Sequence, residues 1–252
     1  MTDRIRVGVL GARGRMGSEV CRAVGAAPDM ELVAALDAGD DLGTLVSASP
    51  DVVVDFTVPS EVMSNIGHCV ASGIDVVVGT SGFTPERLDE VRAILGDQPE
   101  VGVLVAPNFG IGAVLMMQFA AKAAPYFDSV EIIELHHPDK VDAPSGTARQ
   151  TAALIGGARR AAGTPDAPDA TSDDQRVARG ETVAGVAVHS VRLRGLTAHQ
   201  EVLFGSPGET LTIRHDSFDR ASFMPGVLLA VRGVRSRPGL TVGIDDLLEQ
   251  SE

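Results

Sequence analysis

The stretch RIRVGVLGARGRMG, Arg4–Gly17, decides the fold predicted for this chain. A short apolar run, typical of a buried parallel strand, passes directly into a glycine-rich turn and then into a helical pattern. The spacing G-x-x-G-x-x-G permits a tight turn, and the amides that open the following helix suit a pyrophosphate. The motif therefore predicts dinucleotide binding. Because its spacing departs from the commoner G-x-G-x-x-G, a purely structural turn is the alternative.

Further apolar runs follow, each closed by turn residues and separated by helix-like segments. The runs are Glu31–Leu36, Val52–Phe56, Val76–Val78 and Val101–Val105, and the helix-like segments include Pro59–Ser72 and Pro85–Leu95. Repeated strand–helix units predict a parallel sheet. We therefore predict an α/β dinucleotide-binding domain over residues 1–110, completed by residues 217–252, where Phe223–Val234 has helical spacing.

The pattern changes after Asn108 and predicts a smaller α+β domain with a mixed sheet over residues 111–216. Its expected elements are a helix, two strands and an antiparallel hairpin: Gly112–Ala124, a strand ending at Leu135, Val186–Leu193, and Glu201–Phe204 paired with Thr210–Ile213. Segment Gly156–Asp174 is rich in Ala, Pro, Asp and Gly, so we expect a mobile connection there.

Composition excludes several classes of protein. The 252 residues include 34 acidic and 21 basic side chains, and the net charge of -13 repels phosphate backbones and anionic lipid. We therefore expect no nucleic-acid or membrane partner, and an anionic ligand needs a local positive pocket. The lack of an apolar signal core or a membrane-spanning run predicts a cytoplasmic location. Cys21 and Cys69 lack CxxC spacing, so no disulfide framework or zinc site is expected.

Asp37 follows the second predicted strand and lies 20 residues after Gly17. In dinucleotide-binding folds, a carboxylate at roughly this distance from the glycine motif binds the adenosine ribose. Such a carboxylate favours NADH and repels the 2′-phosphate of NADPH. Arg13 and Arg15 lie in the phosphate loop, where they either help to admit that phosphate or are solvated surface cations. Both NADH and NADPH remain expected cofactors.

Three more turns follow predicted strands: DFT at Asp55–Thr57, GTSGF at Gly79–Phe83 and APNFG at Ala106–Gly110. Ligands of open parallel sheets bind beyond the carboxyl ends of the strands. We therefore expect these turns to present amides and small polar groups to a nicotinamide and its ribose. Taken singly, each turn also fits an ordinary end of a strand.

The segment ELHHPDKVDAPSGTA, Glu134–Ala148, carries the candidate chemistry. An imidazole titrates near neutrality, and an ammonium both stabilises developing charge and donates a proton in a closed site. His136 and Lys140 are therefore candidates for proton transfer to a substrate that accepts a hydride. Adjacent side chains of extended backbone point different ways, so His137 is free to hold a substrate carboxylate.

Ser145, Gly146 and Thr147 stand where a helix is predicted to begin, and its amides would form a nest for a carboxylate. The alternatives are an ordinary helix cap for these three residues, a surface cation for Lys140 and plain polar histidines. A zinc site is a poor interpretation, because adjacent histidines without supporting Cys or carboxylate spacing rarely bind one metal ion.

Together these motifs resemble those of the 4-hydroxy-tetrahydrodipicolinate reductase family, formerly called dihydrodipicolinate reductase. The resemblance runs in order from Arg4 to about Leu247 and includes GLTAHQEVLFGSPGETLTIRHDSFDRASFMPGV. It implies a Rossmann-like first domain and a second domain that binds substrate and builds a homotetramer. It further implies NAD(P)H-dependent reduction of a cyclic imine dicarboxylate, with loss of water, in the diaminopimelate route to lysine.

The resemblance also implies residue roles. His136 would give or take a proton and Lys140 would give one, while substrate would be bound by His137, Ser145, Gly146 and Thr147. The cofactor would contact Gly11, Ala12, Arg13, Gly14, Arg15, Met16, Asp37, Gly79, Thr80, Ser81, Ala106, Pro107, Asn108 and Phe109. The chain departs from the family pattern at Ser81, where threonine is more frequent, and at Gly110, where a small side chain is usual. Ala38 stands where some relatives have arginine, which weakens a preference for NADPH.

Two other classes of protein compete with this interpretation. One is another two-domain NAD(P)-dependent reductase that acts on an aldehyde or a different cyclic imine. An acylating aldehyde dehydrogenase needs a thiol nucleophile, and Cys21 and Cys69 are poorly placed for that. The other is a non-catalytic nucleotide-sensing protein that keeps only the fold. Intact His136, His137 and Lys140 argue against it.

Overall fold

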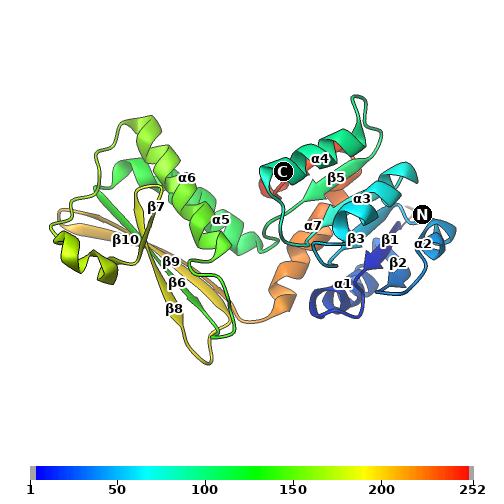
Figure 1. The fold of residues 1–252 in the computed structure, drawn as a ribbon, viewed down its shortest axis with the longest axis horizontal. Coiled ribbons are helices and arrows are strands. Elements are labelled where there is room, and N and C mark those ends of the chain that lie inside the picture. The colour runs from blue at the N-terminus through cyan, green and yellow to red at the C-terminus, as the bar shows by residue number, and fades with distance from the viewer. Residues whose placement is uncertain (1–3, 250–252) are drawn as a thin grey trace. The chain divides into compact units, whose positions relative to one another are not determined.

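The computed structural model describes residues 4–249 and divides the chain into two compact units. The first contains the residues up to Gly110 and those from Phe223 onward, and the second is Ile111–Ser222 (Figure 1). The chain thus returns to the first unit at Phe223 and not at the expected residue 217. The reason is that strand β10 (Glu209–Ser217) pairs with its neighbour as far as Ser217, which keeps this segment in the second unit.

The first unit is built on a parallel sheet of six strands in the order β11-β5-β4-β3-β1-β2. The strands are β1 (Ile5–Leu10), β2 (Met30–Leu36), β3 (Val52–Asp55), β4 (Asp75–Val78), β5 (Gly102–Val105) and β11 (Gly239–Val242). The valine-rich runs of the inner strands are buried, as expected for strands covered on both faces, whereas the edge strands β2 and β11 are mostly only partly buried. The predicted parallel sheet is confirmed, and β11 adds a sixth strand that the sequence patterns did not indicate.

Helices cover both faces of this sheet (Figure 1). They are α1 (Arg15–Ala26), α2 (Leu42–Ala48), α3 (Val62–Ala71), α4 (Pro85–Leu95), α7 (Met224–Val234) and the short α8 (Asp245–Leu248). Leu45 of α2, Ile66 of α3 and Val91 of α4 share one apolar cluster with the sheet, while α1 packs beside α7. Thr84 caps α4 through its hydroxyl, and Pro85 occupies the first turn.

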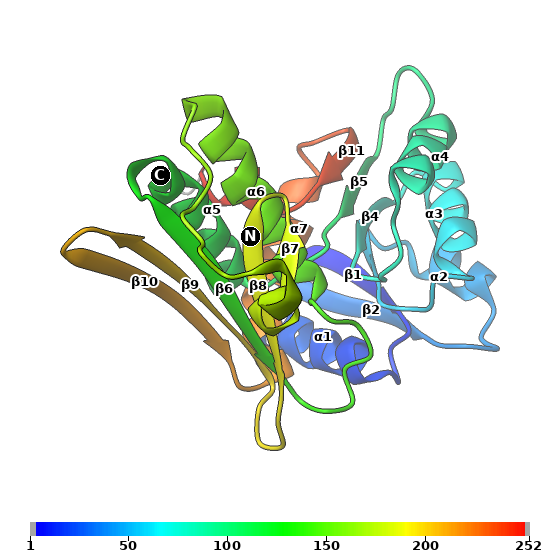
Figure 2. The ribbon, with the colours of Figure 1, turned by 60° about the vertical axis from the view of Figure 1, so that its left-hand side comes forward.

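The second unit is a five-stranded mixed sheet in the order β10-β9-β6-β8-β7. Its strands are β6 (Ser129–His136), β7 (Glu181–Val183), β8 (Val186–Arg192), β9 (Ala198–Ser206) and β10, and β6 is parallel to β8 only. Two helices, α5 (Ile111–Ala123) and α6 (Gly146–Ala162), lie side by side along the sheet (Figure 2). Short 3-10 turns are η1 (Ala124–Tyr126) and η2 (Asp173–Arg179), and a third, η3 (Arg220–Phe223), ends where the chain returns to the first unit.

The expectation of a mobile connection over Gly156–Asp174 was wrong in its first part, because α6 continues to Ala162. Gly156 is buried against the backbone of Ala184, where an added Cβ would lie 2.2 Å from the carbonyl oxygen. Arg159 is also buried, and its guanidinium donates to the carbonyls of Phe127 (2.6 Å) and Pro165 (2.7 Å). These contacts anchor a segment whose composition resembles that of a loop.

The two cysteines are free, and burial raises the pKa of the Cys69 thiol to about 12. Across residues 4–249, no helix has the length and apolar character required to cross a bilayer. Within the same range, no three His, Cys, Asp or Glu side chains are grouped as metal ligands.

Candidate active site

The glycine turn between β1 and α1 depends on two glycines. Gly11 has φ +76°, a conformation that side-chain-bearing residues rarely adopt. A Cβ on Gly17 would lie 2.0 Å from the carbonyl oxygen of Gly11, so the first turn of α1 packs directly on the loop. The amides that open α1 have no intrahelical acceptors by helix geometry, and this end of the helix is favourable for an anion.

Asp37 lies directly after β2 beside this turn. Its carboxylate accepts hydrogen bonds from the amides of Ala38 (2.8 Å) and Arg13 (2.6 Å), and these bonds hold its pKa below the ordinary value. The Arg13 guanidinium donates to Asp40 at 2.8 Å. Asp40 thus neutralises the cation that the sequence offered for a 2′-phosphate.

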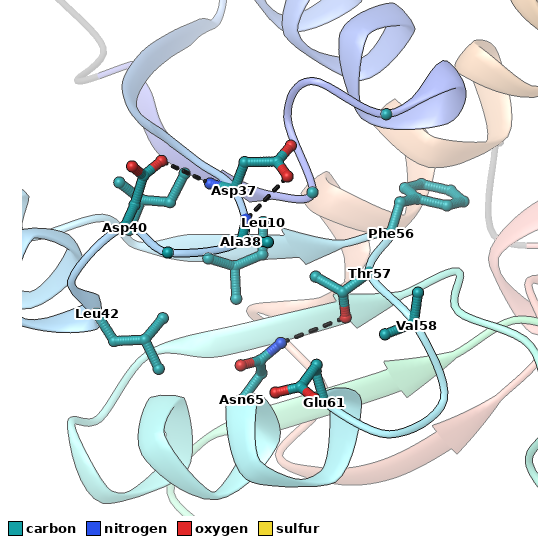
Figure 3. Close-up of a pocket in the computed structure, with 14 residues that line it drawn as sticks. Leu10, Asp37, Ala38, Asp40, Leu42, Phe56, Thr57, Val58, Glu61 and Asn65 are labelled. Atoms are coloured by element: carbon teal, nitrogen blue, oxygen red, sulfur yellow. Dashed lines mark hydrogen bonds between the residues drawn. The ribbon is translucent and has the colours of Figure 1, made fainter.

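A cavity of about 370 Å³ extends from the glycine turn past Asp37 to the DFT turn (Figure 3). This volume lies within the roughly 300–1,000 Å³ that is usual for small-molecule sites. In Figure 3, Asp37 and Asp40 stand on one side, and Thr57 and Asn65 on the other. Of the predicted cofactor contacts, Gly11, Gly14 and Asp37 line the cavity, whereas the other described ones lie outside its lining. Its apolar walls beside a carboxylate and a helix amino terminus fit the adenosine and diphosphate of a dinucleotide.

The DFT and GTSGF turns are joined by the buried carboxylate of Asp55. It accepts hydrogen bonds from the hydroxyls of Thr57 (2.7 Å) and Thr80 (2.8 Å) and from the amide of Asn65 (2.8 Å). Thr80 is itself buried, so its hydroxyl faces the protein interior, while Ser81 is exposed. The network fixes the turns at the carboxyl ends of β3 and β4.

Phe56 connects the same edge of the sheet to the APNFG turn. Its ring lies 5.8 Å from that of Phe109, and a Cβ on Gly79 would approach the Phe56 ring to 2.1 Å. Within the turn, Ala106 and Phe109 are buried, Pro107 is exposed, and Asn108 accepts a hydrogen bond from Gly110 at 2.7 Å. The structure thus brings all three predicted turns to one edge of the sheet.

In the second unit, the end of β6 places His136 beside the fully buried Glu134. Nδ1 of His136 lies 2.6 Å from the Glu134 carboxylate, which also accepts two bonds of 2.8 Å from the Arg192 guanidinium. The backbone amide of Ser145 donates to the same carboxylate at 3.1 Å. Burial raises the pKa of Glu134, but the hydrogen bonds from Arg192, Ser190 and His136 outweigh it, and the pKa falls below the ordinary value.

The pKa of His136 lies below its ordinary value. Burial lowers its pKa most, the contact with Glu134 opposes that effect, and the charges of Lys140 and Arg192 lower the pKa further. An ionised carboxylate can only accept, so Nδ1 carries the hydrogen and Nε2 is left as an acceptor. His136 is therefore suited to take a proton in this state.

Lys140 lies in the loop after β6, where its ammonium is 2.7 Å from the carboxylate of Asp142. Burial raises the pKa of Asp142, and the bonds from Lys140 and the backbone, including the Gly146 amide, outweigh it and lower the pKa. An anion thus already occupies the amino terminus of α6. Ser145 caps this helix by accepting from the amide of Ala148 at 3.2 Å.

The remaining predicted substrate residues surround this loop and helix end: His137 is exposed after β6, Gly146 is exposed, and Thr147 is half-buried. Three residues of the cluster were not predicted: Glu134, Asp142 and Arg192. Glu134 had a usable signal, because it continues the buried face of Val130 and Ile132 in an alternating strand, and a carboxylate in such a position requires partners. Arg192 had no such signal, since it lies far from the Glu134–Ala148 segment in the sequence.

Comparison with known proteins agrees with this geometry. Models of the amino and carboxy termini of dihydrodipicolinate reductase match residues 5–109 and 112–248. The chain belongs to the dihydrodipicolinate reductase family. It is 62% identical over 245 residues to 4-hydroxy-tetrahydrodipicolinate reductase of Nocardia farcinica, covering 97% of this chain and 99% of that protein. Identity to the reductase of Cutibacterium acnes is 61% over 244 residues, covering 97% and 98%.

Among solved structures, the dipicolinate-bound dihydrodipicolinate reductase from Paenisporosarcina sp. TG-14 is 40% identical to this chain. It matches with a TM-score of 0.83 and covers 96% of this chain and 99% of that one. The resemblance drawn from the motifs is confirmed, and so are the two-part α/β fold and the assignment to a reductase family.

Proposed function

We propose that this chain reduces 4-hydroxy-tetrahydrodipicolinate to tetrahydrodipicolinate, with loss of water, in the diaminopimelate route to lysine. Family membership supports an oxidoreductase of this pathway. The observation that carries the proposal is the cluster of His136 and Lys140 beside the amino terminus of α6, in a chain whose glycine turn and Asp37 also line a cavity of a size that fits a dinucleotide.

NADH or NADPH is the hydride donor in this proposal, and the first unit binds it. Gly11–Met16 would hold the diphosphate, Asp37 the adenosine ribose, and Gly79–Ser81 with Ala106–Phe109 the nicotinamide half. The ionised Asp37 and the neutralised Arg13 both favour a free 2′-hydroxyl over a phosphate. We therefore infer that NADPH is accepted less readily than NADH.

The second unit binds the cyclic imine dicarboxylate. His137, Ser145 and the amides of Gly146 and Thr147 would hold its carboxylates, which fits the dipicolinate that the Paenisporosarcina relative binds. The net reaction consumes one hydride and one proton, and the substrate hydroxyl departs as water. Lys140 would supply that proton, while Nε2 of His136 would take the ring proton that is lost with the substrate hydroxyl and pass it to the departing water.

The family resemblance is also the ground for two inferences about the protein in the cell. We infer a homotetramer assembled through the five-stranded sheet, and a cytoplasmic location. Neither requires a nucleic-acid or membrane partner, which the net charge of -13 disfavours.

The substitution Lys140→Ala tests the proposal. We expect kcat to fall about a hundredfold or more, on the scale for loss of a positioned acid, while binding of NADH is retained. The assay follows NADH absorbance with the product of dihydrodipicolinate synthase as substrate, an aldehyde as control, and NADPH in a repeat. Unchanged turnover would remove Lys140 from the mechanism. Turnover of the aldehyde, or of neither substrate, would favour the alternative reductase or the nucleotide sensor.

A further inference from the structure

Glu134 is a charged side chain in a position that a hydrophobic residue would normally occupy. It is fully buried and follows Val130 and Ile132 on the inner face of β6. A buried carboxylate is costly unless it is paired and hydrogen-bonded, and removal of its partners leaves an uncompensated charge. The partners of Glu134 therefore show what this carboxylate organises.

The contacts of Glu134 with Arg192 and His136 determine which nitrogen of the His136 ring carries the hydrogen. The guanidinium of Arg192 binds both carboxylate oxygens at 2.8 Å and favours the ionised form of Glu134, whereas burial favours the neutral form of His136. Nδ1 of His136 then donates to Glu134 at 2.6 Å. This bond selects the Nδ1–H tautomer and leaves Nε2 as the acceptor.

The same carboxylate also anchors the loop that carries Lys140. The amide of Ser145 donates to Glu134 at 3.1 Å, and the Arg192 guanidinium donates to the carbonyl of Asp142 at 2.7 Å. Both attachments come after Lys140 in the sequence, whereas His136 comes before it. The loop is therefore tied to β6 and β8 through one buried ion pair.

We propose that Glu134 is a positioning residue for the reaction, which sets the tautomer of His136 and, through Arg192, the place of the Lys140 loop. This inference rests on the roles proposed above for His136 and Lys140. It assigns no contact between Glu134 and substrate.

Glu131 provides a matched control in the same strand. It also pairs with a histidine and an arginine, since His189 Nε2 lies 2.7 Å from its carboxylate and Arg179 forms an ion pair with it. It is three positions earlier and thus on the opposite face of β6, with about a third of its side chain exposed. Glu131→Gln removes a Glu–His–Arg contact without touching the His136 cluster.

The test compares Glu134→Gln with Glu131→Gln. The Ser145 amide donates to one oxygen of Glu134 and His136 faces the other, so the new amide turns its oxygen to Ser145 and its NH2 to Nδ1 of His136. We expect the His136 ring to change to the Nε2–H tautomer, which ¹⁵N NMR of the folded protein detects, and kcat to fall roughly tenfold to a hundredfold. Glu131→Gln should leave both unchanged.

The pH profile supplies a readout that a merely structural role would not move. Glu134, Lys140 and Arg192 are the charged groups that act on His136, and only Glu134 raises its pKa. In Glu134→Gln the acidic limb of kcat/KM should therefore move to lower pH. If this variant does not fold, Glu134→Asp retains the charge beside Arg192 and withdraws it from Nδ1. Glu134→Asp should then fold and show the same loss of kcat that is expected for Glu134→Gln.

His136→Gln separates failure of this inference from failure of the proposed function. Full turnover of His136→Gln would overturn the role of His136 itself. If His136→Gln is impaired, Glu134→Gln should lower turnover less in that background than it does alone, since the part of its effect that acts through the ring is already lost. Full turnover of Glu134→Gln, or an unchanged tautomer and an unmoved acidic limb, would overturn the positioning role while the role of His136 stands.

Discussion

At the scale of single residues, Asp142 occupies two groups that we assign to the substrate: the Lys140 proton donor and an amide that would hold a carboxylate. Its carboxylate binds the Lys140 ammonium at 2.7 Å and the Gly146 amide at the start of α6. An incoming dicarboxylate would compete with it for these donors. The Asp142 side chain is half exposed, so this ion pair is weak and readily exchanged.

Asp142→Asn should therefore tighten binding of dipicolinate. We expect a gain of up to about fivefold in affinity, because a solvent-exposed ion pair contributes about 1 kcal/mol or less. Titration calorimetry measures it, with the exposed Asp139 of the same loop substituted by Asn as the control. Weaker binding in Asp142→Asn would show that this carboxylate supports the loop and does not compete with the ligand.

Asp40 bears on the choice between NADH and NADPH, because it neutralises Arg13. Asp40→Asn should free the guanidinium for a 2′-phosphate and raise the ratio of kcat/KM for NADPH to that for NADH several-fold. Asp41→Asn is the control, since Asp41 caps α2 through the amide of Gly43. An unchanged ratio in Asp40→Asn would mean that Arg13 does not reach the phosphate.

At the scale of elements, α1 shows that a glycine motif is a packing requirement as well as a binding one. Gly17→Ala would push a methyl group into the carbonyl of Gly11 at 2.0 Å, and backbone cannot move aside as a side chain does. We expect a loss of about 1–3 kcal/mol in the free energy of unfolding, together with weaker NADH binding. Urea denaturation and fluorescence titration measure the two effects.

Gly25 is the matched control in the same helix, because an added Cβ there would meet open space. Gly25→Ala should stabilise the protein by about 0.5–1 kcal/mol through helix propensity alone. Equal effects of the two substitutions would contradict the packing argument.

The helix α6 shows where reading elements from sequence fails. The adjacent Gly156 and Gly157 are unfavourable in a helix, yet the helix runs to Ala162. Gly156 allows the backbone of Ala184 to approach, and Arg159 binds the carbonyls of Phe127 and Asp128. Both reasons lie in distant parts of the chain, so no window of sequence contains them.

At the scale of the whole molecule, the shifted pKa values predict acid lability. Hydrogen bonds hold the pKa of several carboxyls below the ordinary value, as for Asp29 through Arg232 and Asp216 through Arg214. Such groups stabilise the fold above their unfolded pKa, and that stability is lost as pH falls through the folded pKa. Burial lowers the pKa of His136 and His215, so these rings also favour unfolding when pH drops below their unfolded value of 6.5.

The carboxyls and the histidines both lower the free energy of unfolding as the pH falls. The urea midpoint should decline slightly between pH 7 and about pH 5, where the histidines protonate, and steeply below about pH 4, where the carboxyls protonate. Circular dichroism at fixed ionic strength measures the midpoints. A midpoint that rises on acidification would contradict these pKa directions.

By itself, the sequence determined the parallel βα first unit, the glycine turn and the identity of His136 and Lys140 as proton-transfer candidates. Apolar periodicity, glycine spacing and residue chemistry are local properties, so they can be read within a short window. Only the tertiary structure decided how these residues are held. Glu134 and Arg192 are 58 positions apart, and the parallel pairing of β6 with β8 is what places them in contact. The lowered pKa of His136 follows from burial and from the charges that this pairing places around the ring, which no local pattern encodes.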